Sequence, residues 1–162
     1  MFKVGDFVIY RRDVCQIKEI KEKLFFDKDY YIMSTIDDDS LIIKVPVEAS
    51  CYLREVVSKK KANDLISQIP SIDMIDADDK DLEYEYKRLL DEGTLENLVK
   101  IIKTAYLRNQ ERLNQKKKIG EKDDNYFQLA EKRLYNELSV SLDLTFDETR
   151  QYVIDSVKAL LS

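Results

Sequence analysis

The chain has 162 residues, of which 44% are hydrophobic and 36% charged, and its formal net charge is −5. A chain of this length buries about 70% of its unfolded surface, which is enough for one core or two small ones without disulfides. Only three Gly and two Pro occur, which indicates a folded, helix-rich soluble protein and argues against disorder. No apolar run has membrane-spanning length, and the opening MFKVGDFV lacks the layout of a signal peptide. We therefore expect a cytoplasmic protein with no membrane partner.

Catalytic and metal-binding motifs are lacking in the sequence. It has no histidine, which removes Ser-His and Cys-His nucleophile pairs and the usual zinc and haem ligands. Cys15 and Cys51 are far apart and are expected to be reduced core thiols. No glycine-rich phosphate loop is present, and a role for paired carboxylates has no supporting spacing. We expect no enzyme activity, no metal, no cofactor and no small-molecule substrate.

The first 57 residues are predicted to form a small β-barrel. Short segments rich in Val, Ile, Tyr and Phe alternate partly with polar residues, which is typical of half-buried strands. Polar, turn-favouring breaks between them predict antiparallel hairpins. Pro46 lacks an N–H group, so we place it at a sheet edge or strand end. The predicted strands are residues 7–10, 14–21, 29–35, 41–45 and 52–57.

From Ser58 onward the apolar residues recur at intervals of three and four, which predicts helices that pack as a bundle. The first helix, residues 58–69, stops before Pro70. Further helices are expected at 79–91, from 95 toward 113, around 127–142, and after 145. Gly93, Thr94 and the capping box that begins at Thr145 mark their ends. The fold class is therefore α+β, with a β module at 1–57, a connector helix and linker at 58–72, and an α-helical domain at 73–162.

Six segments, taken in order, carry a family resemblance across nearly the whole chain. They are MFKVGDFVIY, VCQIKEI, KVPVE, YLREVVS, LVKIIKTAYLRNQER and DDNYFQLAEKRLYNEL. Together they resemble the CarD/CdnL family of bacterial transcription regulators, whose N-terminal module is shared with transcription-repair coupling factor. The order and spacing of the segments, rather than one motif, make the resemblance specific.

The resemblance implies a Tudor-like N-terminal domain that docks on the RNA polymerase β subunit. It also implies a helical domain that touches promoter DNA near the upstream edge of the melted bubble and tunes the open complex. The docking strand of the family falls at residues 41–47, so the expected polymerase-binding residues are Ile43, Lys44, Val45 and Pro46. Lys44 and Pro46 lie two apart and should share a face. We favour docking for that pair and a core position for Val45, although alternate residues of such a strand can also simply fill the barrel.

Two positions depart from the family. Many members have Gly in the first hairpin where Asp13 stands here, and Asp tolerates left-handed geometry. Well-known members also place a Trp at the start of a C-terminal helix, near Asp79 in this numbering, whereas this chain has no Trp. That absence leaves the DNA-wedging role without an obvious residue.

Tyr84 is the nearest replacement for this Trp. It points away from the apolar stripe of its helix, and Lys80, Lys87 and Arg88 are its helical neighbours. An exposed aromatic ring among cations suits a nucleic-acid backbone and an unstacked base. Alternatively, Tyr84 only covers a seam between domains, and the neighbouring Asp and Glu side chains repel phosphate.

Charge is segregated along the second half. Residues 73–92 contain nine acidic and three basic residues, whereas residues 100–118 contain seven basic and one acidic. The overall net charge argues against autonomous DNA binding, but a modest basic patch could suffice if polymerase supplies most of the affinity. The cations predicted to lie near DNA are Lys100, Lys103, Arg108 and Arg112, extended by residues 116–118. A solvated helix face is the commoner reason for such a run, and the alternative function is a protein-interaction adaptor that uses the same β module without DNA contact.

Overall fold

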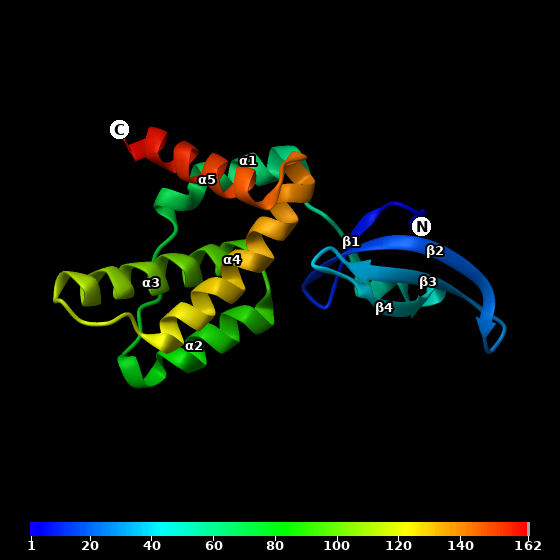
Figure 1. Cartoon of the computed structure of the whole chain (residues 1–162), viewed down its shortest axis with the longest axis horizontal. Coiled ribbons are helices and arrows are strands. Elements are labelled where there is room, and N and C mark those ends of the chain that lie inside the picture. The colour runs from blue at the N-terminus through cyan, green and yellow to red at the C-terminus, as the bar shows by residue number, and fades with distance from the viewer. Residues whose placement is uncertain (162) are drawn as a thin grey trace. The chain divides into compact units, whose positions relative to one another are not determined.

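The computed structural model describes residues 1–161 and has the α+β class expected from the sequence (Figure 1). An antiparallel sheet occupies the N-terminal part and helices occupy the rest. The chain divides into two compact units, Met1–Ser58 and a helical unit that begins at Lys59. Each unit is described below by itself.

The first unit is a five-stranded sheet in the order β4-β3-β2-β1-β5. Neighbouring strands of the sheet pair antiparallel. Its strands are β1 (Phe7–Tyr10), β2 (Asp13–Phe25), β3 (Lys28–Thr35), β4 (Asp38–Pro46) and β5 (Leu53–Glu55), with a short 3-10 segment, η1 (Val47–Tyr52), before β5. The sheet is open, with β4 and β5 at its edges, so the predicted closure into a barrel is not confirmed. Pro46 ends the edge strand β4, which confirms the position expected for a residue without an N–H group.

One face of the sheet carries the core of the first unit. The buried side chains that pack together there are Val8, Cys15, Ile17, Tyr31, Met33, Val45 and Leu53. Burial raises the pKa of the Cys15 thiol to about 11, so this thiol is neutral at physiological pH. Cys51 is exposed, which corrects the expectation that both cysteines are core residues.

Two tight turns in this sheet use bulky residues where the backbone is left-handed. Arg11 and Arg12 connect β1 to β2, and both have positive φ. Phe26 and Asp27 connect β2 to β3, with φ of 50° and 57°. The left-handed residues of the first hairpin are therefore the two arginines, and Asp13 is instead the first residue of β2, which corrects the turn position expected for it.

The second unit consists of five α-helices and one 3-10 turn within the described part of the chain. They are α1 (Lys59–Gln68), η2 (Ile69–Ser71), α2 (Asp79–Glu92), α3 (Leu95–Asn114), α4 (Glu121–Leu142) and α5 (Phe146–Leu161). Helices α3 and α4 lie side by side, and α1 packs against α4 and α5 (Figure 1). The helix predicted as a connector thus packs within the helical unit. None of the described helices combines the length and apolar character needed to cross a membrane.

Local signals fix the helix ends where the sequence placed them. Gly93 is the left-handed C-cap of α2, with φ of 71°, a conformation that glycine adopts without steric cost. The Thr94 side chain accepts a hydrogen bond from the Asn97 amide at 3.1 Å and caps α3. At α5, Thr145 and Glu148 exchange two hydrogen bonds of 3.0 and 3.1 Å, which confirms the capping box.

Candidate docking strand and candidate nucleic-acid face

The strand predicted to dock, β4, is an edge strand with two different faces. Lys44 pairs with Ile32 and Pro46 with Tyr30, so Lys44 and Pro46 lie on one face and Val45 on the other. Val45 is 4% exposed, and Ile43 packs partly buried against the same core. Lys44 is exposed and Pro46 half-buried. Because β4 has a neighbour on one side only, backbone groups along its other side are available to a partner strand.

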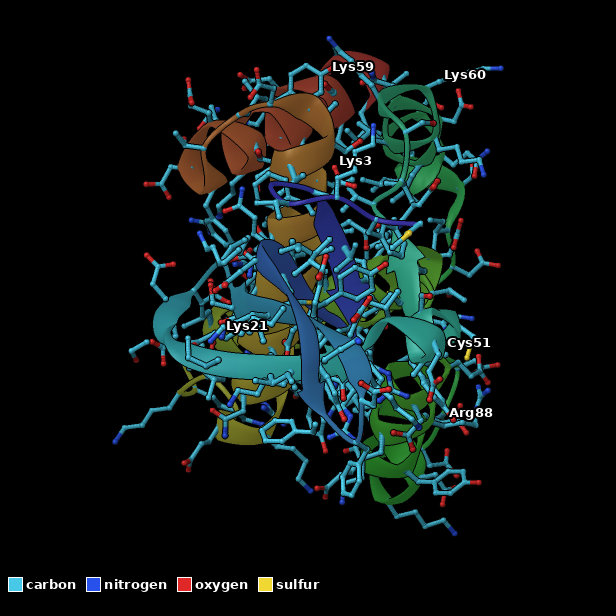
Figure 2. The ribbon with its side chains drawn as sticks, turned by 90° about the vertical axis from the view of Figure 1, so that its right-hand side faces the viewer. Lys3, Lys21, Cys51, Lys59, Lys60 and Arg88 are labelled. Carbon is cyan, nitrogen blue, oxygen red and sulfur yellow. The ribbon has the colours of Figure 1, made fainter. Side chains whose placement is uncertain are left out.

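An aromatic cluster lies beside Lys44 on this outer face. The rings of Phe25 and Tyr30 meet edge to face, with centroids 5.5 Å apart. The Lys44 Nζ atom stands 5.4 Å from the centroid of the Phe25 ring, a distance at which cation and ring attract. Lys21 on β2 pairs with Tyr30 of β3 and thus shares the outer face (Lys21 is labelled in Figure 2). Sequence reasoning missed Lys21, Phe25 and Tyr30, because only strand register brings them to Lys44.

The start of β4 adds exposed apolar side chains to its edge. Between the pairs Thr35–Asp38 and Met33–Ile43, one residue of β3 faces four residues of β4. This irregularity carries Leu41 and Ile42 out of the core, and they are 51% and 54% exposed. The acidic run at 37–40 was expected to be a break between strands, but β4 already begins at Asp38.

Tyr84 opens onto an acidic hollow rather than a basic surface. Its side chain is 68% exposed. It borders a hollow of about 520 Å³ whose other lining residues are Asp76, Ala77, Asp78, Asp81 and Glu85. Carboxylates at this density disfavour phosphate and favour a cation.

The two cations predicted to accompany Tyr84 are engaged within their own helix. Lys87 lies 3.5 Å from Glu83. Arg88 pairs with Glu85 at 2.8 Å and with Glu92 at 2.6 Å. Both side chains remain exposed, but the paired carboxylates offset the positive charge that Lys87 and Arg88 present to solvent.

Arg108 and Arg112 point into the helical unit, where they meet a buried carboxylate. Asp123, near the start of α4, is 3% exposed. It accepts hydrogen bonds from Arg108 Nε at 3.1 Å, from Arg112 at 3.2 Å and from the Tyr86 hydroxyl at 2.7 Å. Arg108 also pairs with Asp79 at 2.9 Å. Burial and the Asp123 carboxylate raise the pKa of Tyr86, so its hydroxyl stays protonated and donates.

Lys103 is also held by internal partners. Its Nζ atom donates to the carbonyl oxygens of Ile69, at 2.9 Å, and Ile72, and thereby satisfies backbone acceptors after α1. The structure therefore does not bring the α3 cations together on one solvent face. Lys100 is half-buried, and the lysines that extend freely are those at 116–118, which are all exposed.

A second run of three lysines, at 59–61, was not singled out from the sequence. All three are exposed in the first turn of α1, and Figure 2 shows Lys59 and Lys60 extending outward there. The positive end of the helix dipole disfavours cations at this position. Three consecutive lysines in the sequence are the feature by which this cluster could have been predicted.

Nothing in the described residues suggests a metal centre, since they contain no group of three His, Cys, Asp or Glu side chains placed to hold one. Comparison of the chain with protein-family models gave no match. No curated protein matches it at a significant level. The likeness to the CarD/CdnL family therefore stays a prediction that depends on the six quoted segments.

Proposed function

We propose that the protein is a transcription regulator that docks on the β subunit of bacterial RNA polymerase through Met1–Ser58 and tunes the promoter open complex. The observation that carries this proposal is the edge strand β4. Its Lys44 and Pro46 share an outer face, and they lie in the segment KVPVE that contributes to the family resemblance. On the strength of that resemblance we assign the sheet to the Tudor-like class.

Strand addition is the docking mode that an edge strand supports best. Main-chain hydrogen bonds to a polymerase strand would supply affinity, and side chains on alternate positions would supply specificity. Lys44, held over Phe25, offers a positioned positive charge to a carboxylate on the partner. Leu41 and Ile42 are exposed on the same strand and provide apolar area.

The DNA-contacting role falls on fewer cations than the sequence suggests. Lys103, Arg108 and Arg112 have internal partners, which leaves Lys100 and the loop lysines 116–118 for phosphate. Such contacts are weak and non-specific. They suffice only because docking on polymerase raises the local concentration of DNA.

The docking proposal is tested by reversing the charge of Lys44 in the full chain. We expect wild-type protein to bind a polymerase β fragment that contains its outer lobe, and Lys44→Glu to bind at least about tenfold more weakly. Lys3→Glu, at another exposed lysine of the same unit, is the matched control and should bind as wild type. Isothermal calorimetry gives the affinity and circular dichroism checks the fold. Equal binding by wild type and Lys44→Glu would contradict the proposed strand.

A second candidate function is a protein-interaction adaptor that docks through the same strand and never contacts DNA. The acidic hollow beside Tyr84 and the internal pairing of Arg108 and Arg112 favour it.

The two functions differ in what the loop lysines do. Replacing Lys116, Lys117 and Lys118 by Gln should shorten the open-complex lifetime if the loop contacts DNA. The same replacement at Lys59, Lys60 and Lys61 removes an equal charge elsewhere on the helical unit. Unchanged lifetimes for both variants would support the adaptor.

A further inference from the structure

The hairpin formed by β2 and β3 ends in an aromatic residue that the fold does not use. Phe25 pairs with Lys28, so Phe26 and Asp27 form a two-residue turn. Both have positive φ, as a type I′ turn requires, and such turns strongly prefer Asn, Asp and Gly. The side chain of Phe26 is 90% exposed. Figure 1 shows this hairpin extending beyond the remaining strands of the sheet.

Folding does not account for a phenylalanine at this position. A left-handed backbone brings Cβ too close to the following carbonyl oxygen, so a bulky residue is strained there. The exposed ring gains almost no burial to offset that strain. The contacts beside the tip are few: the Lys23 amide donates to Asp29 Oδ1 at 3.0 Å, and the Lys23 ammonium lies 3.9 Å from the Asp27 carboxylate.

Phe26 directly follows Phe25, a member of the aromatic cluster beside Lys44. Its chain neighbour Phe25 is 46% exposed, stacks edge to face on Tyr30 and supports the Lys44 ammonium. Exposed aromatic side chains thus occur both in the cluster beside β4 and at the hairpin tip that follows it in the chain. An exposed apolar patch of this kind, rimmed by polar residues, marks a protein interaction site.

The charges around the patch define the chemistry of its partner. Lys21 and Lys44 lie on the outer face on either side of β3, and neither forms an ion pair with the residues that the structure describes. Lys28, by contrast, is paired with Glu48. The complementary surface is an apolar pocket bordered by carboxylates.

We infer that Phe26 is an aromatic anchor that inserts into an apolar, carboxylate-bordered pocket on the protein to which β4 docks. This inference rests on the proposed function and adds to it a contact from outside the docking strand. A rigid aromatic side chain that fills a desolvated pocket contributes far more than its neighbours to an interface. The strain at the turn is then explained by binding, because the turn presents the ring at the far end of the hairpin.

The test uses the full chain with Phe26 replaced by Asn, a residue that favours left-handed geometry. We expect Phe26→Asn to keep or raise the thermal unfolding midpoint while binding the polymerase β fragment about 30-fold more weakly, the scale of an interface hot spot. Tyr52→Ala is the matched control, because Tyr52 belongs to the same unit and is 71% exposed. It should bind as wild type.

Each result of this experiment decides the inference. Weaker binding by Phe26→Asn alone supports the anchor, particularly if Phe26→Leu restores part of the affinity. If Phe26→Asn binds as wild type while Lys44→Glu does not, the anchor is overturned and the docking strand stands. If Tyr52→Ala is weakened equally, the effect is not specific to the tip and the anchor is overturned. If wild-type protein does not bind, the proposed function fails and the anchor fails with it.

Discussion

Asp123 ties three helices of the second unit together. It lies on α4 and accepts hydrogen bonds from Tyr86 on α2 and from Arg108 and Arg112 on α3. The carboxylate is buried, whereas the side chains of Arg108 and Arg112 are 26% and 33% exposed. Neutralising Asp123 would remove the negative charge that accepts hydrogen bonds from Tyr86, Arg108 and Arg112.

We expect Asp123→Asn to lower the free energy of unfolding by about 2–3 kcal/mol, because it leaves Arg112 without its counter-charge and leaves Arg108 with Asp79 alone. Urea denaturation followed by circular dichroism measures the change. Asp124→Asn is the control, since Asp124 is half-buried and its side chain accepts a hydrogen bond from its helical neighbour Gln128 rather than from another helix. A loss of similar size in both variants would contradict a special role for Asp123.

Residue roles could be predicted from the sequence only where they depend on local pattern. Alternation along β4 places Val45 in the core and Lys44 outside, as the structure has them. The direction of the Arg108 and Arg112 side chains depends on Asp123. That residue lies on the next helix, α4, beyond the loop that follows α3. Helical periodicity within α3 contains no information about that partner, so both arginines were expected to face solvent.

At the scale of elements, helix ends could be predicted and hairpin geometry could not. Gly93, Thr94 and Thr145 act within one helical turn of their own position, and their signals are correct. The turn at Phe26 and Asp27 contains one favoured residue, Asp27, but Phe26 stands where Asn, Asp or Gly is usual, so the sequence did not indicate a two-residue turn. Strand β2 consequently extends to Phe25, four residues past the predicted end.

The capping box of α5 gives a quantitative prediction. Thr145→Ala removes the acceptor of the Glu148 amide and should lower the free energy of unfolding of the helical unit by about 1 kcal/mol. Thr145→Ser retains the hydroxyl and serves as the control in the same denaturant titration. If alanine and serine are equivalent, the cap does not contribute to stability.

Glu148 makes the same cap sensitive to acid. Hydrogen bonds from the Thr145 amide and side chain lower the pKa of Glu148 below its ordinary value. Its contribution to stability is therefore complete above the unfolded-state pKa and is lost as pH falls through the folded-state pKa. The difference in unfolding free energy between wild type and Glu148→Gln should be present at neutral pH and disappear in acid. A difference that does not change with pH would contradict this assignment.

At the scale of the whole molecule, each unit has buried side chains of its own. Met33 in the sheet and Leu138 in α4 are both fully buried. Replacing either by Ala should cost about 2–5 kcal/mol, because each change leaves a cavity.

Hydrogen exchange measured by mass spectrometry should locate these two effects. Met33→Ala should accelerate exchange within Met1–Ser58, and Leu138→Ala should accelerate it from Lys59 onward. The two variants thus control for each other. Acceleration throughout the chain in both would show that the units unfold as one.

The left-handed turns at Arg11–Arg12 and Phe26–Asp27 bear on the order in which a new chain acquires structure. Unfolded chains rarely visit that backbone region with bulky residues, so both hairpins should close late, and sheets made of distant pairings fold slowly in any case. The helices form from residues that are close in the sequence, which is fast. Translation delivers the sheet unit first, yet we expect the helical unit to finish folding first. During that interval the strands, including the apolar edge of β4, are open to aggregation, and a nascent chain would depend on chaperones mainly for its sheet unit.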